Sequence, residues 1–275
     1  MRAFISPKPG RAIVGIDYGS QEFLLSALMS EDQEMISAYG SGDPYLYFAK
    51  LDGAVPNDGT KKTHKAERDI YKSVTLGISY NMGAAGLAQK LTNDLGKTYS
   101  EEQAEGLILS FKEAFPDFAE WQRDLIEEYR EGGKWSHVKL PCGWYMWGNN
   151  QNWRSVGNVP IQGFGSSIMR KAVGLAQDAG LDVIYTLHDA LYVEYNSCDW
   201  GCIETLYKAM EAAFWHYIHK HLKNCVKVKM DIFTWSPDYD ALSQGIFNDL
   251  SYDMSNIYVD DKGKKDYKKY SKYCI

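Results

Sequence analysis

The chain has little of what a membrane, secreted or zinc-stabilised protein requires. It is 275 residues long and has no apolar run of about 18 residues, so the sequence predicts no membrane span. The start, residues 1–7, lacks the long apolar segment of a signal peptide. The five cysteines are an odd, scattered set without the paired spacing of a zinc site. We therefore expect free thiols and a cytoplasmic location.

Positive charge is also scarce. Lysine and arginine number 30 against 36 aspartates and glutamates, which gives a formal net charge of −6. A broad grip on duplex DNA needs many cationic side chains, because phosphate contacts depend on them. The composition therefore argues against a protein that holds duplex DNA unaided, but it leaves room for a local basic site. The 45% hydrophobic and 24% charged content is that of an ordinary globular protein.

Strand-like runs lie near both ends of the chain, with helical patterns between them. We expect strands over 12–16, 183–187, 190–195 and 226–233, a hairpin over 135–147, and helices over 22–30, 65–91 (interrupted near 81–83), 100–115, 117–132, 159–177 and 203–222. Ser100 and Asp117 are the expected N-caps of two of these helices. The order predicts an α+β fold, a sheet platform with a helical insertion.

Two acids stand where strands end. Asp17 follows the first apolar run, and Asp189 lies at the tip of the turn between the second and third. A carboxylate held on a rigid frame yet exposed suits a hard cation such as Mg²⁺. Two of them on neighbouring strands can clamp two ions about 3.5–4 Å apart. Taken singly, each acid is more often a turn or cap residue.

A stripe of four residues marks the helix expected over 65–91. Arg68, Lys72, Leu76 and Tyr80 follow one another every four residues, so each is displaced by about 40° around the helix. The two cations can meet a triphosphate, and the apolar and aromatic residues can meet a sugar and base. The alternative is a solvated cationic face beside an ordinary core edge.

A second ladder with the same spacing is polar. Arg154, Asn158 and Gln162 surround the start of the helix expected at Val159. Long polar side chains repeated in this way can contact minor-groove acceptors and sugars without demanding a sequence. The alternative is a solvent-exposed polar stripe.

Together, and in this order, these motifs resemble the family A DNA polymerases, the DNA polymerase I family. Residues 17–22 look like the first palm motif, and residues 188–189 look like the second. Arg68, Lys72, Tyr80 and Met82-Gly83 resemble the fingers helix, and the polar ladder with Gly163 resembles the helix that contacts the primer–template. The similarity extends from about residue 2 to residue 235.

The resemblance implies a right-hand palm, with an antiparallel sheet and packed helices, and a helical fingers insertion. It implies palm at 1–37 and 135–235, fingers at 38–134, and a C-terminal tail at 236–275 that docks a partner or is simply polar. In this family the thumb and any 3′–5′ exonuclease domain precede the palm. We therefore expect the C-terminal half of a split polymerase of bacteriophage type, which works with a second chain in the host cytoplasm.

The family's metal and primer roles map onto four residues. Asp17 and Asp189 are expected to bind two Mg²⁺ ions, with Mn²⁺ as the alternative metal and the Tyr18 carbonyl as a further ligand. His188 is expected to steady the primer terminus. The implied activity is template-directed addition of deoxynucleotides to a primer 3′-hydroxyl.

The nucleotide roles follow in the same way. Arg68 and Lys72 are expected to neutralise the triphosphate, with Lys72 donating a proton to pyrophosphate. Glu22 is expected to fill the space that a ribose 2′-hydroxyl needs and to hydrogen-bond Tyr80. Tyr45 stands where the family usually has a histidine that touches the triphosphate, and Leu76 lies beside the sugar. Arg154, Asn158 and Gln162 are expected to bind primer–template DNA.

Several positions depart from the family pattern. Gly19 and Ser20 replace Ser and Gln, Leu76 replaces an aromatic residue, Asn81 replaces Gly, and Ala190 replaces Glu. The segment around residues 141–143 lacks the usual paired arginines, which puts template contacts there in doubt.

Three other functions compete with this interpretation. A non-catalytic palm–fingers subunit that binds DNA or a partner has no reason to keep both acids together with the fingers stripe. An RNA polymerase or template-independent transferase should leave room for a 2′-hydroxyl, which Glu22 fills. A metal-dependent nuclease can use the two acids but does not need the fingers helix.

Overall fold

The computed structural model describes residues 5–133, 136–147, 153–196, 199, 201–224 and 226–235. Within this part of the chain, no helix has the length and apolarity that crossing a membrane requires. The fold is α+β, as the sequence predicts, and the chain forms two compact units. Of the described residues, the sheet unit draws on those within 5–21, 166–219 and 228–235, and the helical unit on those within 22–165 and 220–227. The palm and fingers bounds expected from the family stay a prediction.

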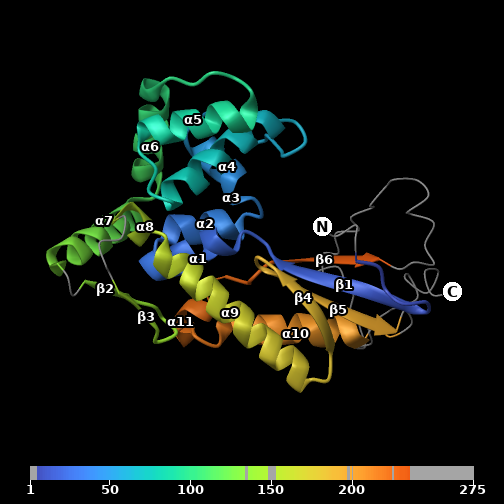
Figure 1. Cartoon of the computed structure of the whole chain (residues 1–275). Coiled ribbons are helices and arrows are strands. Elements are labelled where there is room, and N and C mark those ends of the chain that lie inside the picture. Colours follow the sequence, from blue (N-terminus) through green and yellow to red (C-terminus); the bar gives the residue numbers. More distant parts are fainter. Residues whose placement is uncertain are drawn as a thin grey trace. The chain divides into compact units, whose positions relative to one another are not determined.

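The sheet unit is built on four antiparallel strands. In sheet order they are β4 (Asp182–Leu187), β5 (Ala190–Asn196), β1 (Arg11–Tyr18) and β6 (Met230–Trp235). Figure 1 shows β1, in blue, among strands of the yellow and orange end of the sequence. The first strand is therefore central, and both its neighbours come from the last third of the chain.

The core of this sheet depends on a glycine. Gly15 on β1 pairs with Tyr192 on β5. The Tyr192 ring occupies the space above the glycine, because a Cβ at position 15 would lie 2.4 Å from Tyr192 Cε1. That ring is fully buried and stacks on Tyr185 with centroids 4.1 Å apart. Gly15 thus lets two tyrosines fill the centre of the sheet.

Helix α10 (Gly201–Trp215) packs on the sheet (Figure 1). The hydroxyl of Tyr18 donates a hydrogen bond to the Met210 carbonyl at 2.6 Å, and the Tyr18 ring lies 5.5 Å from the Phe214 ring. The end of β1, next to Asp17, is therefore fixed from below by a buried tyrosine.

The helical unit contains most of the helices. They are α1 (Gln21–Ser30), α2 (Gln33–Gly40), α3 (Pro44–Leu51), α4 (Lys65–Ser79), α5 (Ala84–Leu95), α6 (Glu101–Ala114), α7 (Pro116–Glu131), α8 (Trp153–Val156) and α11 (Lys220–Lys223). A hairpin of β2 (His137–Lys139) and β3 (Tyr145–Trp147) follows α7. Helix α9 (Val159–Asp178) begins in this unit and continues into the sheet unit.

An aromatic core holds these helices together. Phe48 lies at the centre of it, with ring centroids 4.8 Å from Tyr71, 5.4 Å from Phe111 and 5.4 Å from Phe115. Residues of α3, α4 and α6 meet at these rings, so the helix that carries the cationic stripe is anchored on its inner face.

The expected helix starts are confirmed in one case and wrong in another. Ser100 caps α6 in a reciprocal capping box with Gln103. Asp117 does not cap α7, whose N-cap is Phe115. Pro116 occupies the first turn, where its fixed φ and missing N–H suit a helix start, so Asp117 lies inside the helix.

Candidate functional site

The sheet brings the two predicted metal-binding acids together. Asp17 pairs with Ala190 in the β1–β5 ladder, and Ala190 directly follows Asp189. The Tyr18 amide donates to the Asp189 carbonyl at 3.2 Å, which ties the two segments together beyond the ladder. Both acids are half-buried at this end of the sheet. The sequence could name them as candidates, but only the strand pairing makes them neighbours.

The turn that presents Asp189 has an unusual backbone. Leu187 and Ala190 close a tight hairpin, with His188 and Asp189 between them. His188 has φ +54°, in the left-handed region that side-chain-bearing residues rarely adopt. Such strain is found most often where function fixes the backbone. The exposed His188 therefore lies beside the acid in a conformation fixed by the hairpin.

Sequence reasoning missed a third acid on the same sheet. Asp231 on β6 is the ladder partner of Asp17 on the side opposite to Ala190. Directly opposed residues of antiparallel strands project from the same face. Asp17 therefore lies between Ala190 and Asp231 in one row. In the sequence Asp231 looks like an isolated acid in a late strand, and only the register reveals its position.

The chemistry of these donors fits a hard divalent cation. Carboxylate and backbone carbonyl oxygens are the ligands that Mg²⁺ takes, and Mg²⁺ usually retains several waters rather than a complete protein cage. No group of three or more ligating side chains is already gathered around one point in the described residues. Asp17 and Asp189 therefore fit ions that share their coordination with water and substrate.

In the helical unit, α4 carries the predicted stripe as one continuous feature. Lys72 is exposed and Leu76 is half-buried, and Tyr80 is the C-cap residue, with 41% of its surface exposed. No ion pair joins Lys72 to another described residue. After Tyr80, Asn81 adopts φ +54°, a conformation that asparagine tolerates better than most residues. The chain thus forms a turn with a left-handed residue here, although asparagine replaces the glycine that the family has at this position.

Arg68 is paired within the unit. Its Nε donates to Asp43 Oδ2 at 2.9 Å, and its NH1 donates to Asp69 Oδ1 at 3.2 Å. Its guanidinium also lies 5.0 Å from the centroid of the Tyr45 ring. Tyr45 is only 6% exposed and contacts Phe23 edge-on. The structure thus joins two predicted nucleotide-binding residues, but it places Tyr45 in the core.

Glu22, Tyr80 and Gln162 form one hydrogen-bonded group. The Tyr80 hydroxyl donates to Glu22 Oε1 at 3.3 Å, and Gln162 Nε2 donates to the same hydroxyl at 2.5 Å. Gln162 Nε2 also lies 3.4 Å from Glu22 Oε1. Burial and the charge and hydrogen bond of Glu22 raise the pKa of Tyr80, while the amides of Asn158 and Gln162 act in the opposite direction. The phenol therefore stays protonated and able to donate.

The residues of the polar ladder differ in their exposure to solvent. Gln162 is exposed on α9, whereas Asn158 is 3% exposed between α8 and α9. The Arg154 side chain lies outside the described residues. A uniformly solvated polar stripe, the alternative left open by the spacing, is therefore wrong for Asn158.

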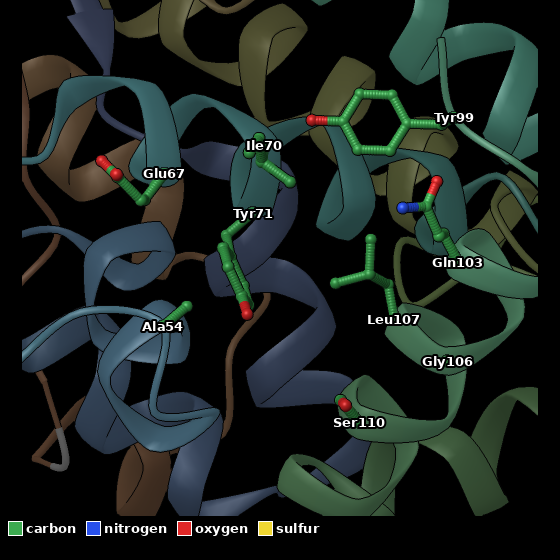
Figure 2. A pocket seen from close by; sticks show the side chains of 9 residues that line it. All are labelled: Ala54, Glu67, Ile70, Tyr71, Tyr99, Gln103, Gly106, Leu107 and Ser110. Carbon is green, nitrogen blue, oxygen red and sulfur yellow. The ribbon is translucent and has the colours of Figure 1, made fainter. Parts of the chain in front are cut away.

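An open hollow of about 390 Å³ lies in the helical unit (Figure 2). Its lining comes from the turn after α3, from α4, from the loop before α6 and from α6: Ala54, Glu67, Ile70, Tyr71, Tyr99, Gln103, Gly106, Leu107 and Ser110. Neither Arg68 nor Lys72 lines it. We assign no ligand to it.

The fold has a match among solved structures. The POL domain of Pol1 from M. smegmatis, in complex with DNA primer–template and dNTP, superposes with a TM-score of 0.66 and 22% sequence identity. The match covers 83% of this chain and 40% of that one. The α+β fold of this chain is thus similar to the fold of that domain.

The sequence comparisons give the family. The profile of DNA polymerase family A matches residues 1–234, and the chain belongs to that family. DNA polymerase I of Aquifex aeolicus is 29% identical over 201 residues, which are 70% of this chain and 34% of that protein. The DNA polymerase of Mycobacterium phage D29 is 27% identical over 208 residues, 74% of this chain and 32% of that protein. The chain therefore spans about a third of the length of these relatives.

Proposed function

We propose that this chain is the catalytic part of a DNA-directed DNA polymerase, which adds deoxynucleotides to a primer 3′-hydroxyl on a template strand. The observation that carries the proposal is the pairing of β1 with β5, which sets Asp17 beside the Asp189 turn in a chain of this family. The substrates are primer–template DNA and deoxynucleoside triphosphates.

Asp17, Asp189 and the Tyr18 carbonyl hold two Mg²⁺ ions in this proposal. When bound, such ions lower the pKa of the attacking hydroxyl and stabilise the charge on the leaving phosphates. His188 orients the primer terminus from its fixed place in the turn. The half-burial of both acids supports this assignment, because each keeps one side open to substrate.

Lys72 is the residue that meets the triphosphate and protonates the departing pyrophosphate. Its exposure on α4 supports the role. Arg68 contributes by moving from Asp43 to the phosphates, or by fixing α4 while Lys72 does the binding. The nucleotide is also contacted by Leu76 and Tyr45 in this proposal. The primer–template DNA is bound by Arg154, Asn158 and Gln162.

Glu22 selects deoxynucleotides by filling the space of a 2′-hydroxyl. Its hydrogen bond with Tyr80, and the second bond from Gln162, support this because they hold the carboxylate in one orientation.

A primer-extension assay at low ionic strength tests the activity, with Asp189→Asn as the inactivating variant. We expect Mg²⁺-dependent extension by the chain and a loss of at least about 100-fold in the variant, since the charge of a metal ligand is removed. Asp182→Asn is the matched control, because Asp182 lies on the same hairpin but pairs with Arg11 at its other end. Equal extension by the chain and the Asp189 variant contradicts the assignment.

We also propose that this chain works with a second protein that carries a thumb and a 3′–5′ exonuclease. The net charge of −6 supports it, because a chain of this composition binds duplex DNA more tightly when a cationic partner supplies phosphate contacts. Co-purification followed by extension in increasing salt tests it. Processive extension at physiological salt by the purified chain alone contradicts it.

A further inference from the structure

Gln122 is a buried polar residue of α7 that ties this helix to the end of α4. It is 7% exposed, and its Nε2 donates to the carbonyls of Ile78 and Ser79 at 3.3 Å each. The last four carbonyls of a helix have no partner within the helix, and a side-chain amide carries two N–H groups that can serve two of them. Gln122 therefore holds the last turn of α4, directly before Tyr80.

The same side chain lies against the turn between α8 and α9. A Cβ at Gly157 would come 3.0 Å from Gln122 Nε2 and 3.1 Å from its Cγ, so the amide occupies the space beside the glycine. Gly157 directly precedes Asn158, whose carbonyl accepts a hydrogen bond from the Gln162 backbone amide at 3.0 Å. Gln122 therefore contacts the turn from which the helix that carries Gln162 begins.

Helix α7 is itself held at its start. The Phe118 amide donates to Asp32 Oδ2 at 3.1 Å, and the other oxygen of this carboxylate caps α2 by accepting from the Met35 amide at 2.8 Å. Asp32 is buried, so water does not compete for these bonds. Gln122 follows Phe118 by about one turn of helix. The amide thus projects from a helix that is fixed against the segment following α1.

The two turns that Gln122 contacts carry the two hydrogen-bonding partners of Glu22. Tyr80 follows the end of α4, and Gln162 lies in the first turn of α9. Gln162 Nε2 donates to the Tyr80 hydroxyl at 2.5 Å, and the hydroxyl and Nε2 lie 3.3 and 3.4 Å from Glu22 Oε1. Hydrogen bonds weaken steeply when distance or angle changes. The orientation of the carboxylate therefore depends on how far apart the two turns are held.

We propose that Gln122 is a positioning residue for sugar selection. It sets the spacing of Tyr80 and Gln162, and through them it sets the orientation of the Glu22 carboxylate. The inference rests on the proposed function in one respect, that Glu22 fills the space of a ribose 2′-hydroxyl. Gln122 lies in the interior of the helical unit and acts without touching the nucleotide. Its effect should therefore appear in the choice between sugars.

Primer extension at low ionic strength tests the proposal through the ratio of kcat/KM for ribonucleotides to kcat/KM for deoxynucleotides. Gln122→Met keeps about the same volume but donates to neither carbonyl, so the turn before Tyr80 can shift. We expect the ratio to rise about 3- to 10-fold, because a small displacement weakens an oriented contact. In the Glu22→Ala chain the same substitution should add nothing, since the gate is already absent.

Gly157→Ala tests the same amide from its other side. The added methyl group should displace the Gln122 amide, so the ratio should rise in this variant too. Gln122→Ala makes room for that methyl group, so adding Gly157→Ala to it should raise the ratio no further. Ile126→Val, one turn along α7, is the matched control. It removes a buried methyl group but no hydrogen bond, and it should leave the ratio unchanged.

Hydrogen exchange provides a measurement that does not depend on activity. The Asn81 amide donates to the Ile78 carbonyl at 2.7 Å, in the turn that Gln122 holds. In Gln122→Met this amide should exchange about ten-fold faster, because the turn opens more often. Ile126→Val should leave its exchange unchanged. Equal exchange in the parent chain and in Gln122→Met would show that Gln122 does not hold the turn.

Failure of this inference is distinguishable from failure of the proposed function. If Glu22→Ala raises the ratio but Gln122→Met and Gly157→Ala do not, the gate stands and the positioning role is overturned. The role is also overturned if Gln122→Met raises the ratio equally with and without Glu22, because the effect then does not pass through the carboxylate. A chain that extends no primer contradicts the proposed function, and the exchange of the Asn81 amide then still decides whether Gln122 holds the turn.

Discussion

Arg68 and Asp43 form a charged pair at 2.9 Å that joins α4 to the start of α3. Their side chains are only 13% and 20% exposed, so solvent screens the pair less than at an open surface. Asp43 has a second role, because its Oδ1 caps α3 by accepting from the Leu46 amide. The Asp43 carboxylate therefore fixes both the start of α3 and the guanidinium of Arg68.

Asp43→Asn should separate these two roles. Asparagine is a good N-cap, so the cap survives, but its amide cannot accept from Arg68 while oriented to cap. We expect a loss of about 2 kcal/mol in the free energy of unfolding from the charged hydrogen bond, and about 1 kcal/mol more in Asp43→Ala. Urea denaturation with Arg68→Ala and the double variants measures the coupling. A fully additive cycle would show that the pair is not stabilising.

Glu22→Ala should relax sugar selection. Removing the carboxylate opens the volume of a 2′-hydroxyl and leaves Tyr80 bonded only to Gln162 in this group. We expect ribonucleotide incorporation relative to deoxynucleotide to rise about 10- to 100-fold. Tyr80→Phe, which keeps the ring but loses the hydroxyl, should have a smaller effect. Glu127→Ala on the exposed face of α7 is the control, and an unchanged ratio in Glu22→Ala would remove the gate assignment.

Asp231→Asn should affect stability and metal binding in opposite directions. Like charges directly opposite in a ladder destabilise, so without Mg²⁺ we expect the variant to be more stable by up to about 1 kcal/mol. A bound cation turns the same repulsion into attraction, so the variant should bind Mg²⁺ more weakly. Thermal denaturation with and without Mg²⁺, and calorimetric titration, measure both effects. A change of the same sign in both would contradict the shared-face arrangement.

Gly15→Ala should destabilise the sheet unit strongly, although it adds only one methyl group. The new Cβ collides with the buried Tyr192 ring, and overpacking of this kind costs about 1–3 kcal/mol. Gly174→Ala in α9 has open space around it and should instead stabilise by about 0.5–1 kcal/mol, since alanine favours helix. Chemical denaturation of the two variants measures the change in the free energy of unfolding. Equal changes would show that the Tyr192 ring can move aside at little cost.

Much of the fold could be predicted because its signals are local. Helical periodicity, the Ser100 capping box, the Pro160 helix start and the acid at the hairpin tip each depend on a few neighbouring residues. The two acids and the stripe of α4 could be found in the same way, from strand ends and four-residue spacing. The failure at Asp117 arose because Pro116 sets the helix start more firmly than a cap does.

What the sequence could not reveal depends on register and distance. The position of Asp231 beside Asp17 follows from strand pairing, and the Arg68–Asp43 pair joins residues on different helices. The burial of Asn158 and Tyr45 is likewise a property of packing. The pairing of His137 with Trp147 in the hairpin likewise follows from the register of β2 with β3.

The central place of β1 has a consequence for synthesis. The ribosome makes this strand before helices α1 to α8, but its partners β5 and β6 emerge only after those helices have been made. In the helical unit, α2 to α6 each contact the next helix along the chain, whereas the sheet must bring together distant parts of the chain, and such pairing is slow. The helices should therefore fold first. Until β5 and β6 have been made, the apolar strand β1 stays unpaired and is prone to aggregate. Completing the sheet is then also the step that assembles Asp17 with Asp189.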